Sequence, residues 1–112
     1  MKVFSTAFHG LLDYATVATL PSLFRALDAG KETQQVADRG AQAVLAYSVL
    51  TRYERGVVKI LPVPLHLLLD AALGAVLLQT AARQTGEKQA VRAALLGLGL
   101  FSLFASVATE TD

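Results

Sequence analysis

Long stretches without lysine or arginine are the feature that most restricts how this chain can fold. Residues 3–24, 60–82 and 93–109 contain neither residue. Each stretch approaches the roughly 20 apolar residues that a helix needs to cross a bilayer. Residues 40–51 form a fourth stretch, too short to cross unless the arginines that flank it extend their charges toward the two membrane surfaces. The pattern predicts a bundle of membrane-spanning helices.

Four helices are predicted, over about residues 3–27, 33–54, 62–84 and 88–109. The segments between them are polar and contain glycine or proline, which are residues that end helices. The apolar runs are long and rich in leucine and alanine, and they do not alternate with polar residues. No strand pattern therefore competes with the helical one.

A soluble four-helix bundle is the alternative, and the composition argues against it. Apolar residues make up 54% of the chain and charged residues 17%, compared with about 25% charged residues in typical soluble domains. Residues 65–78 contain no polar side chain except His66 and Asp70. A helix that is apolar on all sides is deeply buried or in lipid, and a domain of this size cannot bury two of them. We therefore predict one integral membrane domain over residues 1–112.

Charge and cysteine content exclude several classes of protein. The net charge is +1 at pH 7, and the sequence has no clustered basic face of the kind that binds nucleic acid. The chain has no cysteine, which excludes disulfides, thiolate metal ligands and a cysteine nucleophile. It also has no glycine-rich phosphate loop, nucleophile elbow or metalloprotease motif. We therefore expect no enzymatic activity.

The sequence predicts an internal duplication. A shift of 57 residues superposes the polar residues of the first and third helices, and a shift of 58 superposes those of the second and fourth. Matches of leucine and alanine mean little in such a composition, but matches of polar residues in apolar segments are informative. Repeat 1 covers about residues 1–56 and repeat 2 about residues 57–112. The matched polar pairs are His9 with His66, Asp13 with Asp70, Ser48 with Ser106, Thr51 with Thr109, and Glu54 with Asp112.

The duplication has a geometric consequence. Each repeat is a helical hairpin, so the second repeat enters the bundle on the same side as the first. The fold class is then an all-α four-helix transmembrane bundle of two tandem hairpins, related by a pseudo-two-fold axis along the membrane normal. We expect His9 and His66 at the same depth, with Thr51, Glu54, Thr109 and Asp112 near that level.

Two histidine–aspartate pairs form the most unusual feature of the apolar segments. His9 and Asp13 are four residues apart, as are His66 and Asp70, so each pair lies on one helix face. Ionisable residues in membrane spans normally face the bundle interior and find partners there. The leading interpretation is a polar packing lock without a cofactor, in which each aspartate bonds to its own histidine or to a polar side chain of a neighbouring helix. The candidate partners are Ser48, Thr51, Glu54, Ser106 and Thr109.

Two other roles remain open for the same four residues. Two imidazoles and two carboxylates can fill a tetrahedral shell suited to zinc, or part of a larger shell for iron or manganese. The metal ligands would be His9, Asp13, His66 and Asp70. Alternatively, the histidines and aspartates exchange protons near one membrane surface.

Three segments stand out together: His9-Gly10-Leu11-Leu12-Asp13-Tyr14 followed by Pro21, Thr51-Arg52-Tyr53-Glu54-Arg55-Gly56, and Pro62 followed by His66-Leu67-Leu68-Leu69-Asp70. In this order and spacing they resemble a group of small bacterial four-helix membrane proteins with an HG-x-x-D-Y motif, related to the SPW-repeat family. The chain departs from the SPW repeat itself. It has no tryptophan, and Leu77-Leu78-Gln79 replaces the second proline-containing element of that repeat. The resemblance implies a two-hairpin fold in the bacterial cytoplasmic membrane, and it implies no activity.

The leading functional hypothesis is a non-enzymatic, multi-pass membrane protein. It would contact the lipid bilayer and either form a homo-oligomer or serve as an accessory subunit of a larger membrane complex. The short second apolar stretch, which cannot span comfortably by itself, favours such a partner. The alternative is a metal- or proton-binding membrane protein that uses the symmetric His/Asp cluster.

Overall fold

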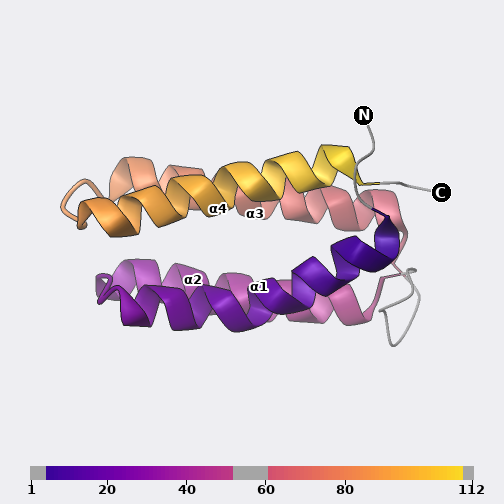
Figure 1. Cartoon of the computed structure of the whole chain (residues 1–112), viewed down its shortest axis with the longest axis horizontal. Coiled ribbons are helices and arrows are strands. Elements are labelled where there is room, and N and C mark those ends of the chain that lie inside the picture. The colour runs from indigo at the N-terminus through magenta and orange to yellow at the C-terminus, as the bar shows by residue number, and fades with distance from the viewer. Residues whose placement is uncertain (1–4, 52–60, 110–112) are drawn as a thin grey trace.

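The computed structural model describes residues 5–51 and 61–109, and over these residues the chain is all-helical, with four helices and no strand (Figure 1). This confirms the predicted number and order of helices. The helices are α1 (Thr6–Ala26), α2 (Lys31–Val49), α3 (Val63–Arg83) and α4 (Gln89–Ala108).

The end of α2 differs from the prediction of a helix over 33–54. The helix stops at Val49, and the next residues leave the helical path because their backbone pairs with the segment before α3. Leu61 N donates to Leu50 O at 2.6 Å, and Thr51 forms an isolated parallel bridge with Leu61. Glu54 lies outside the described residues.

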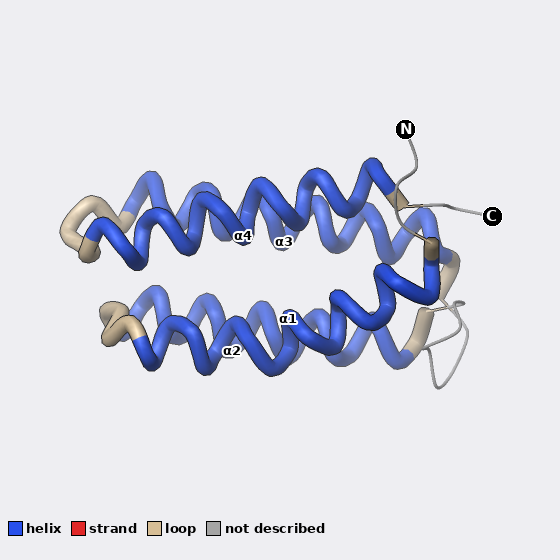
Figure 2. The backbone as a smooth tube through the Cα atoms, in the orientation of Figure 1, coloured by secondary structure: helices blue, strands red, loops and turns tan. Residues whose placement is uncertain are grey.

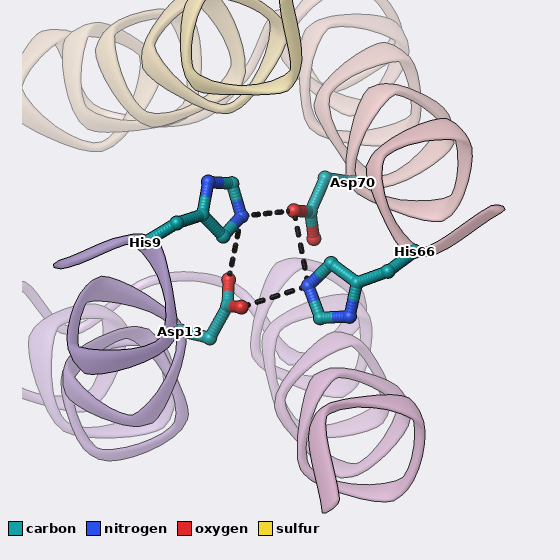
Figure 3. A group of neighbouring side chains, drawn as sticks. All are labelled: His9, Asp13, His66 and Asp70. Carbon is teal, nitrogen blue, oxygen red and sulfur yellow. Dashed lines mark hydrogen bonds and ion pairs between the residues drawn. The ribbon is translucent and has the colours of Figure 1, made fainter. Parts of the chain in front are cut away.

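The four helices form two antiparallel hairpins that lie one against the other (Figures 1 and 2). Helix α1 packs along α2, and α3 packs along α4, while most of the backbone contact between the hairpins is made by α2 and α3. The turns within the hairpins lie at one end, and the end of α2 and the start of α3 lie at the other (Figure 1). Viewed along the bundle, α1 and α3 occupy diagonal positions (Figure 3).

The two ends of the bundle have different interiors. Near the hairpin turns the core is apolar and includes Leu20, Phe24, Leu77 and Leu95. The two hairpin turns are also joined there. Both carboxylate oxygens of Glu87, in the second turn, accept from the backbone N–H of Gly30, the residue before α2, at 3.0 Å. Near the opposite end a small apolar cluster of Val63 and Leu67 lies beside a group of buried polar side chains. The polar side chains are those of His9, Asp13, Thr51, His66, Asp70 and Thr109.

The second hairpin has a close helix crossing. A Cβ placed on Gly74 would lie 2.7 Å from the carbonyl oxygen of Gly99, and one placed on Gly99 would lie 2.9 Å from the oxygen of Gly74. Backbones approach this closely only where both residues lack side chains. The positions that match them under the predicted duplication are Val17 and Ala41, which both carry a side chain.

Among the described residues, α3 and α4 are the helices long and apolar enough to cross a membrane. Helix α1 does not reach the same standard, although the sequence led us to expect a span there. Its lack of lysine and arginine before Arg25 is offset by polar residues such as Thr6, His9, Asp13 and Thr16. Helix α2 carries charged and amide side chains along its first half.

Candidate metal centre

Four side chains meet on the axis of the bundle, two from α1 and two from the diagonally opposite α3 (Figure 3). His9, Asp13, His66 and Asp70 are 2%, 6%, 1% and 4% exposed, respectively. One potential ligand atom from each residue lies within 4.8 Å of the other three. The structure thus brings together the two pairs that the sequence placed on separate helices.

The shortest contacts join the two helices. His9 Nε2 lies 2.5 Å from Asp70 Oδ2, and His66 Nε2 lies 2.7 Å from Asp13 Oδ2. Within each helix, the Nε2–carboxylate distance is 3.3 Å for both pairs. Each histidine is therefore closer to the aspartate of the other hairpin than to its own, because the two helices point their pairs at each other across the axis.

Thr109, just after α4, fixes the protonation of one histidine ring. Its hydroxyl lies 2.6 Å from the backbone oxygen of Ala105 and 2.6 Å from His9 Nδ1. A carbonyl oxygen can only accept, so the single hydroxyl proton goes to Ala105, and the hydroxyl oxygen accepts from the ring. His9 consequently carries a proton on Nδ1.

The other histidine has the same arrangement, but here the threonine belongs to the first hairpin and the histidine to the second. The Thr51 hydroxyl donates to the backbone oxygen of Tyr47 at 2.5 Å and lies 2.6 Å from His66 Nδ1. His66 therefore also carries its proton on Nδ1. In both rings the remaining nitrogen, Nε2, faces the two carboxylates.

This arrangement requires positive charge at the centre. A neutral ring protonated on Nδ1 presents a lone pair at Nε2. A lone pair facing a carboxylate oxygen at 2.5–2.7 Å is repulsive unless a cation lies between them. Two protons satisfy the requirement by making both rings imidazolium ions. One divalent metal ion satisfies it equally, because it supplies the same charge.

The donor atoms fit a metal ion after a small adjustment. Bonds of 2.0–2.1 Å to nitrogen and oxygen in a tetrahedral zinc site place neighbouring ligand atoms about 3.3 Å apart. The two contacts within a helix measure 3.3 Å, the one within α1 being made by Oδ1 of Asp13. The two contacts between helices are shorter, at 2.5 and 2.7 Å, and the second of them is made by Oδ2 of Asp13. One ligand atom from each residue lies within 4.8 Å of the others, so a tetrahedral shell requires the short contacts to lengthen and the longest separations to shorten, by up to about 1.5 Å.

Tyr47 makes the cluster asymmetric, and the sequence had assigned it no role there. Its hydroxyl donates to Asp70 Oδ1 at 2.5 Å, and its ring packs edge-on against His66, with centroids 4.7 Å apart. The residue that corresponds to Tyr47 in the second half is Ala105, which has no hydroxyl. Asp70 therefore presents one oxygen to the centre, whereas both oxygens of Asp13 face histidines.

The serines do not have the role that the sequence suggested. Ser106 donates to the backbone oxygen of Leu103 at 2.7 Å. Within residues 5–51 and 61–109, the hydroxyl of Ser48 has no hydrogen-bond partner although the residue is fully buried. Tyr47 occupies the place beside Asp70 that a serine was expected to fill, because its longer side chain reaches the carboxylate. The threonines contact the histidines and not the aspartates.

Comparison with known proteins returned no significant match to a family model, a curated protein or a solved structure. The resemblance to the SPW-repeat group stays a prediction, and the function of the cluster must be inferred from its geometry.

Proposed function

We propose that this protein is a small integral membrane protein that binds one divalent transition-metal ion on the axis of its four-helix bundle. The ligands are His9 and His66 through Nε2 and Asp13 and Asp70 through carboxylate oxygens. One observation carries the proposal. Both Nδ1 atoms are held by threonine hydroxyls, so both Nε2 atoms and two carboxylates surround a single point, and neutral rings would direct two Nε2 lone pairs at it.

The threonines act as outer-shell partners in this proposal. A histidine that binds a metal normally donates its other N–H to a fixed acceptor, which sets the tautomer and the orientation of the ring. Thr109 and Thr51 provide such acceptors for His9 and His66. A packing lock made of imidazolium–carboxylate pairs does not need the tautomer to be selected, because both ring nitrogens are then protonated.

The chemistry of the donors limits the ion. Imidazole and carboxylate ligands suit zinc, iron, manganese and cobalt, whereas the lack of thiolate and thioether ligands disfavours copper(I). Two neutral imidazoles and two carboxylates around a divalent ion give a site with no net charge. Neutrality is important because an uncompensated charge inside a membrane bundle is costly.

The bound ion would also join the two hairpins. All four ligands come from α1 and α3, which are diagonal to each other (Figure 3), whereas the backbone contact between the hairpins is made mostly by α2 and α3. An ion on the axis supplies a direct connection between α1 and α3. The predicted packing lock and the metal site are thus two states of one cluster.

The surface of α3 and α4 supports a membrane location. Their most apolar stretches are only 39% and 28% buried within the bundle, which is unlike the core helix of a soluble protein. Large apolar side chains such as Leu68, Leu100 and Val107 are 64%, 58% and 66% exposed. Lipid covers such a surface at no cost. A second copy or a larger membrane complex would pack against the same faces, and the bacterial cytoplasmic membrane is the location that the resemblance implies.

Elemental analysis of the detergent-purified protein tests the metal site. The protein should carry a tag without histidine, and no chelator should be used. We expect about one zinc, iron or manganese ion per chain, and none in the variant His9→Gln/His66→Gln. Ser22→Ala is the matched control, because Ser22 is an exposed residue on α1 that bonds only to the backbone oxygen of Ala18. Equal metal in all three proteins, or none after incubation with each ion, would contradict the proposal.

Proton release distinguishes a metal centre from adventitious binding. If the empty cluster holds two protons, binding one divalent ion displaces about two of them. The apparent affinity should then fall about a hundredfold for each unit by which the pH is lowered. Titration of metal-free protein in weakly buffered detergent solution measures this number, and a value near zero would indicate binding elsewhere.

A further inference from the structure

Two grooves lie between the hairpins on opposite sides of the bundle, one between α1 and α4 and one between α2 and α3. An inner cavity beside the first groove is lined by side chains of all four helices, among them Val44 of α2 and Leu73 of α3. Under the predicted duplication, with its shifts of 57 and 58 residues, residues that line one groove match residues that line the other. The matched pairs are Leu12 with Leu69, Thr16 with Leu73, Leu98 with Gly40, and Phe101 with Ala43.

The grooves differ in whether they reach the cluster. The α2/α3 groove ends at Tyr47, and none of the four cluster residues lines it. The residue that matches Tyr47 in the second repeat is Ala105, which lines the inner cavity beside the α1/α4 groove. The smaller side chain leaves this cavity, of about 40 Å³, which touches His9, Asp13 and Asp70. One water needs about 10–15 Å³ measured in this way, so the cavity has room for a molecule of a few atoms.

We propose that the metal centre keeps one exchangeable ligand position, which opens into this cavity on the Ala105 side. The inference rests on the proposed metal site. Water fills the position, and a small monodentate oxygen or nitrogen donor replaces it. Tyr47 holds Asp70 so that one carboxylate oxygen faces the centre. Both oxygens of Asp13 lie near histidine nitrogens, at 3.3 and 2.7 Å, so Asp13 is the ligand that can shift when the position fills.

The surroundings of the cavity restrict the ligand and its route. Apart from the cluster residues, Ser102 and Thr16, the cavity walls are apolar. Leu12, Leu98 and Phe101 line both the cavity and the outer part of the groove between α1 and α4. A ligand therefore enters sideways between these two helices, which favours small molecules that cross apolar surroundings without a charge. A position of this kind is typical of reactive metal sites and unlike the closed shell of structural zinc.

Cobalt(II) spectroscopy with azide as the probe tests the inference. Cobalt(II) reports its coordination number in the visible spectrum, and azide, whose protonated form is neutral, fits the cavity. We expect azide to change the spectrum of the cobalt-loaded wild-type protein in a saturable way with one azide per ion. Ala105→Leu should bind cobalt as the wild type does, because Thr109 bonds to the backbone oxygen of this residue and not to its side chain. Its azide affinity should be lower by more than about tenfold, since leucine takes the volume that the ligand needs.

Two further variants complete the experiment. Ala43→Leu is the matched control, because Ala43 is the equivalent of Phe101 in the opposite groove and does not line the cavity. It should leave the azide response unchanged. Ala105→Val replaces the leucine variant if that variant does not fold. Cobalt binding without an azide response in the wild type, or an equal response in the position-105 variants, overturns the inference and leaves the metal site standing. Absence of cobalt binding overturns both.

Discussion

The two hairpins contribute equivalent polar residues to the axis but present different surfaces to their surroundings. Each supplies a histidine, an aspartate four residues later, and a threonine that bonds to the histidine of the other hairpin. On the outside, most of the exposed large apolar side chains belong to α3 and α4, and the first hairpin exposes only Phe8, Leu11 and Leu45 among the described residues. Helix α2 also exposes the polar side chains of Gln35, Arg39 and Gln42. The interior is therefore nearly symmetric and the exterior is not.

This difference separates two requirements on the sequence. The cluster needs both hairpins, because each histidine has its nearest carboxylate and its threonine on the opposite one. The outer faces have no such mutual constraint, so α3 and α4 suit lipid while α1 and α2 tolerate polar contacts. One residue breaks the interior symmetry: Tyr47 closes its side of the cluster, and Ala105 leaves the other side open.

The largest expected effect is loss of a histidine ligand, compared between the two halves. His9→Gln and His66→Gln should each weaken metal binding by more than about 100-fold, beyond the range seen for outer-shell residues. The two effects should be similar, because both rings contact both aspartates. Competition with a chromophoric chelator measures the affinities. If one variant keeps wild-type affinity, the ion does not lie on the axis.

Removal of each threonine hydroxyl tests the symmetric outer partners. Thr51→Val and Thr109→Val each remove the hydroxyl that accepts from Nδ1, so neither the tautomer nor the orientation of that ring is fixed any longer. We expect each substitution to lower metal affinity by about 10–100-fold. The same chelator competition measures both. Unchanged affinity in both variants would show that the threonines do not select the tautomer.

Tyr47→Phe affects one side of the cluster alone. It removes the hydrogen bond to Asp70 Oδ1 and should lower metal affinity by about tenfold, at the small end of outer-shell effects. The variant should also let Asp70 bind through either oxygen, which changes the cobalt(II) spectrum. An affinity equal to that of the wild type would mean that Tyr47 serves packing only.

The glycine crossing of the second hairpin gives a smaller effect, on stability. Gly74→Ala places a methyl group 2.7 Å from the backbone oxygen of Gly99, and we expect the free energy of unfolding to fall by about 1 kcal/mol or more. Gly97→Ala is the control, since a Cβ there meets no atom within 4 Å, and it should be neutral or slightly stabilising. Denaturation in mixed micelles measures both, and equal effects would argue against a close crossing.

The smallest effect is expected for the ion pair of the first hairpin. Arg25 and Asp38 lie 2.7 Å apart, with side chains 54% and 33% exposed. Solvent screens such a pair, so Arg25→Ala should change the free energy of unfolding by about 0–1 kcal/mol. A larger loss in the same micelle assay would indicate that this region is buried against lipid or a partner.

Much of the fold was predictable, because the helices are bounded by local signals. Stretches without lysine or arginine, together with glycine and proline between them, predict four helices whose ends agree with the structure to within a few residues. Helix α2 was the exception, since its end depends on a contact between Leu50 and Leu61 that is not local to the helix.

The residues of the cluster were predictable, but their pairing was not. The spacing of four residues places His9 beside Asp13 and His66 beside Asp70 on their own helices. The shorter contacts cross to the other hairpin because α1 and α3 are diagonal. The role of Tyr47 depends on a contact between its side chain in the first hairpin and Asp70 in the second, and no local sequence pattern predicts that contact.

Anomalous X-ray diffraction from crystals of the metal-loaded protein, measured on both sides of the absorption edge of the bound ion, would locate the ion. We expect one peak per chain on the bundle axis, within bonding distance of His9 Nε2, His66 Nε2 and a carboxylate oxygen of both Asp13 and Asp70. A peak at the surface or at a chain terminus, or no peak in crystals grown with excess zinc, would contradict the proposed metal site. The cluster would then be a set of imidazolium–carboxylate pairs that joins the two hairpins.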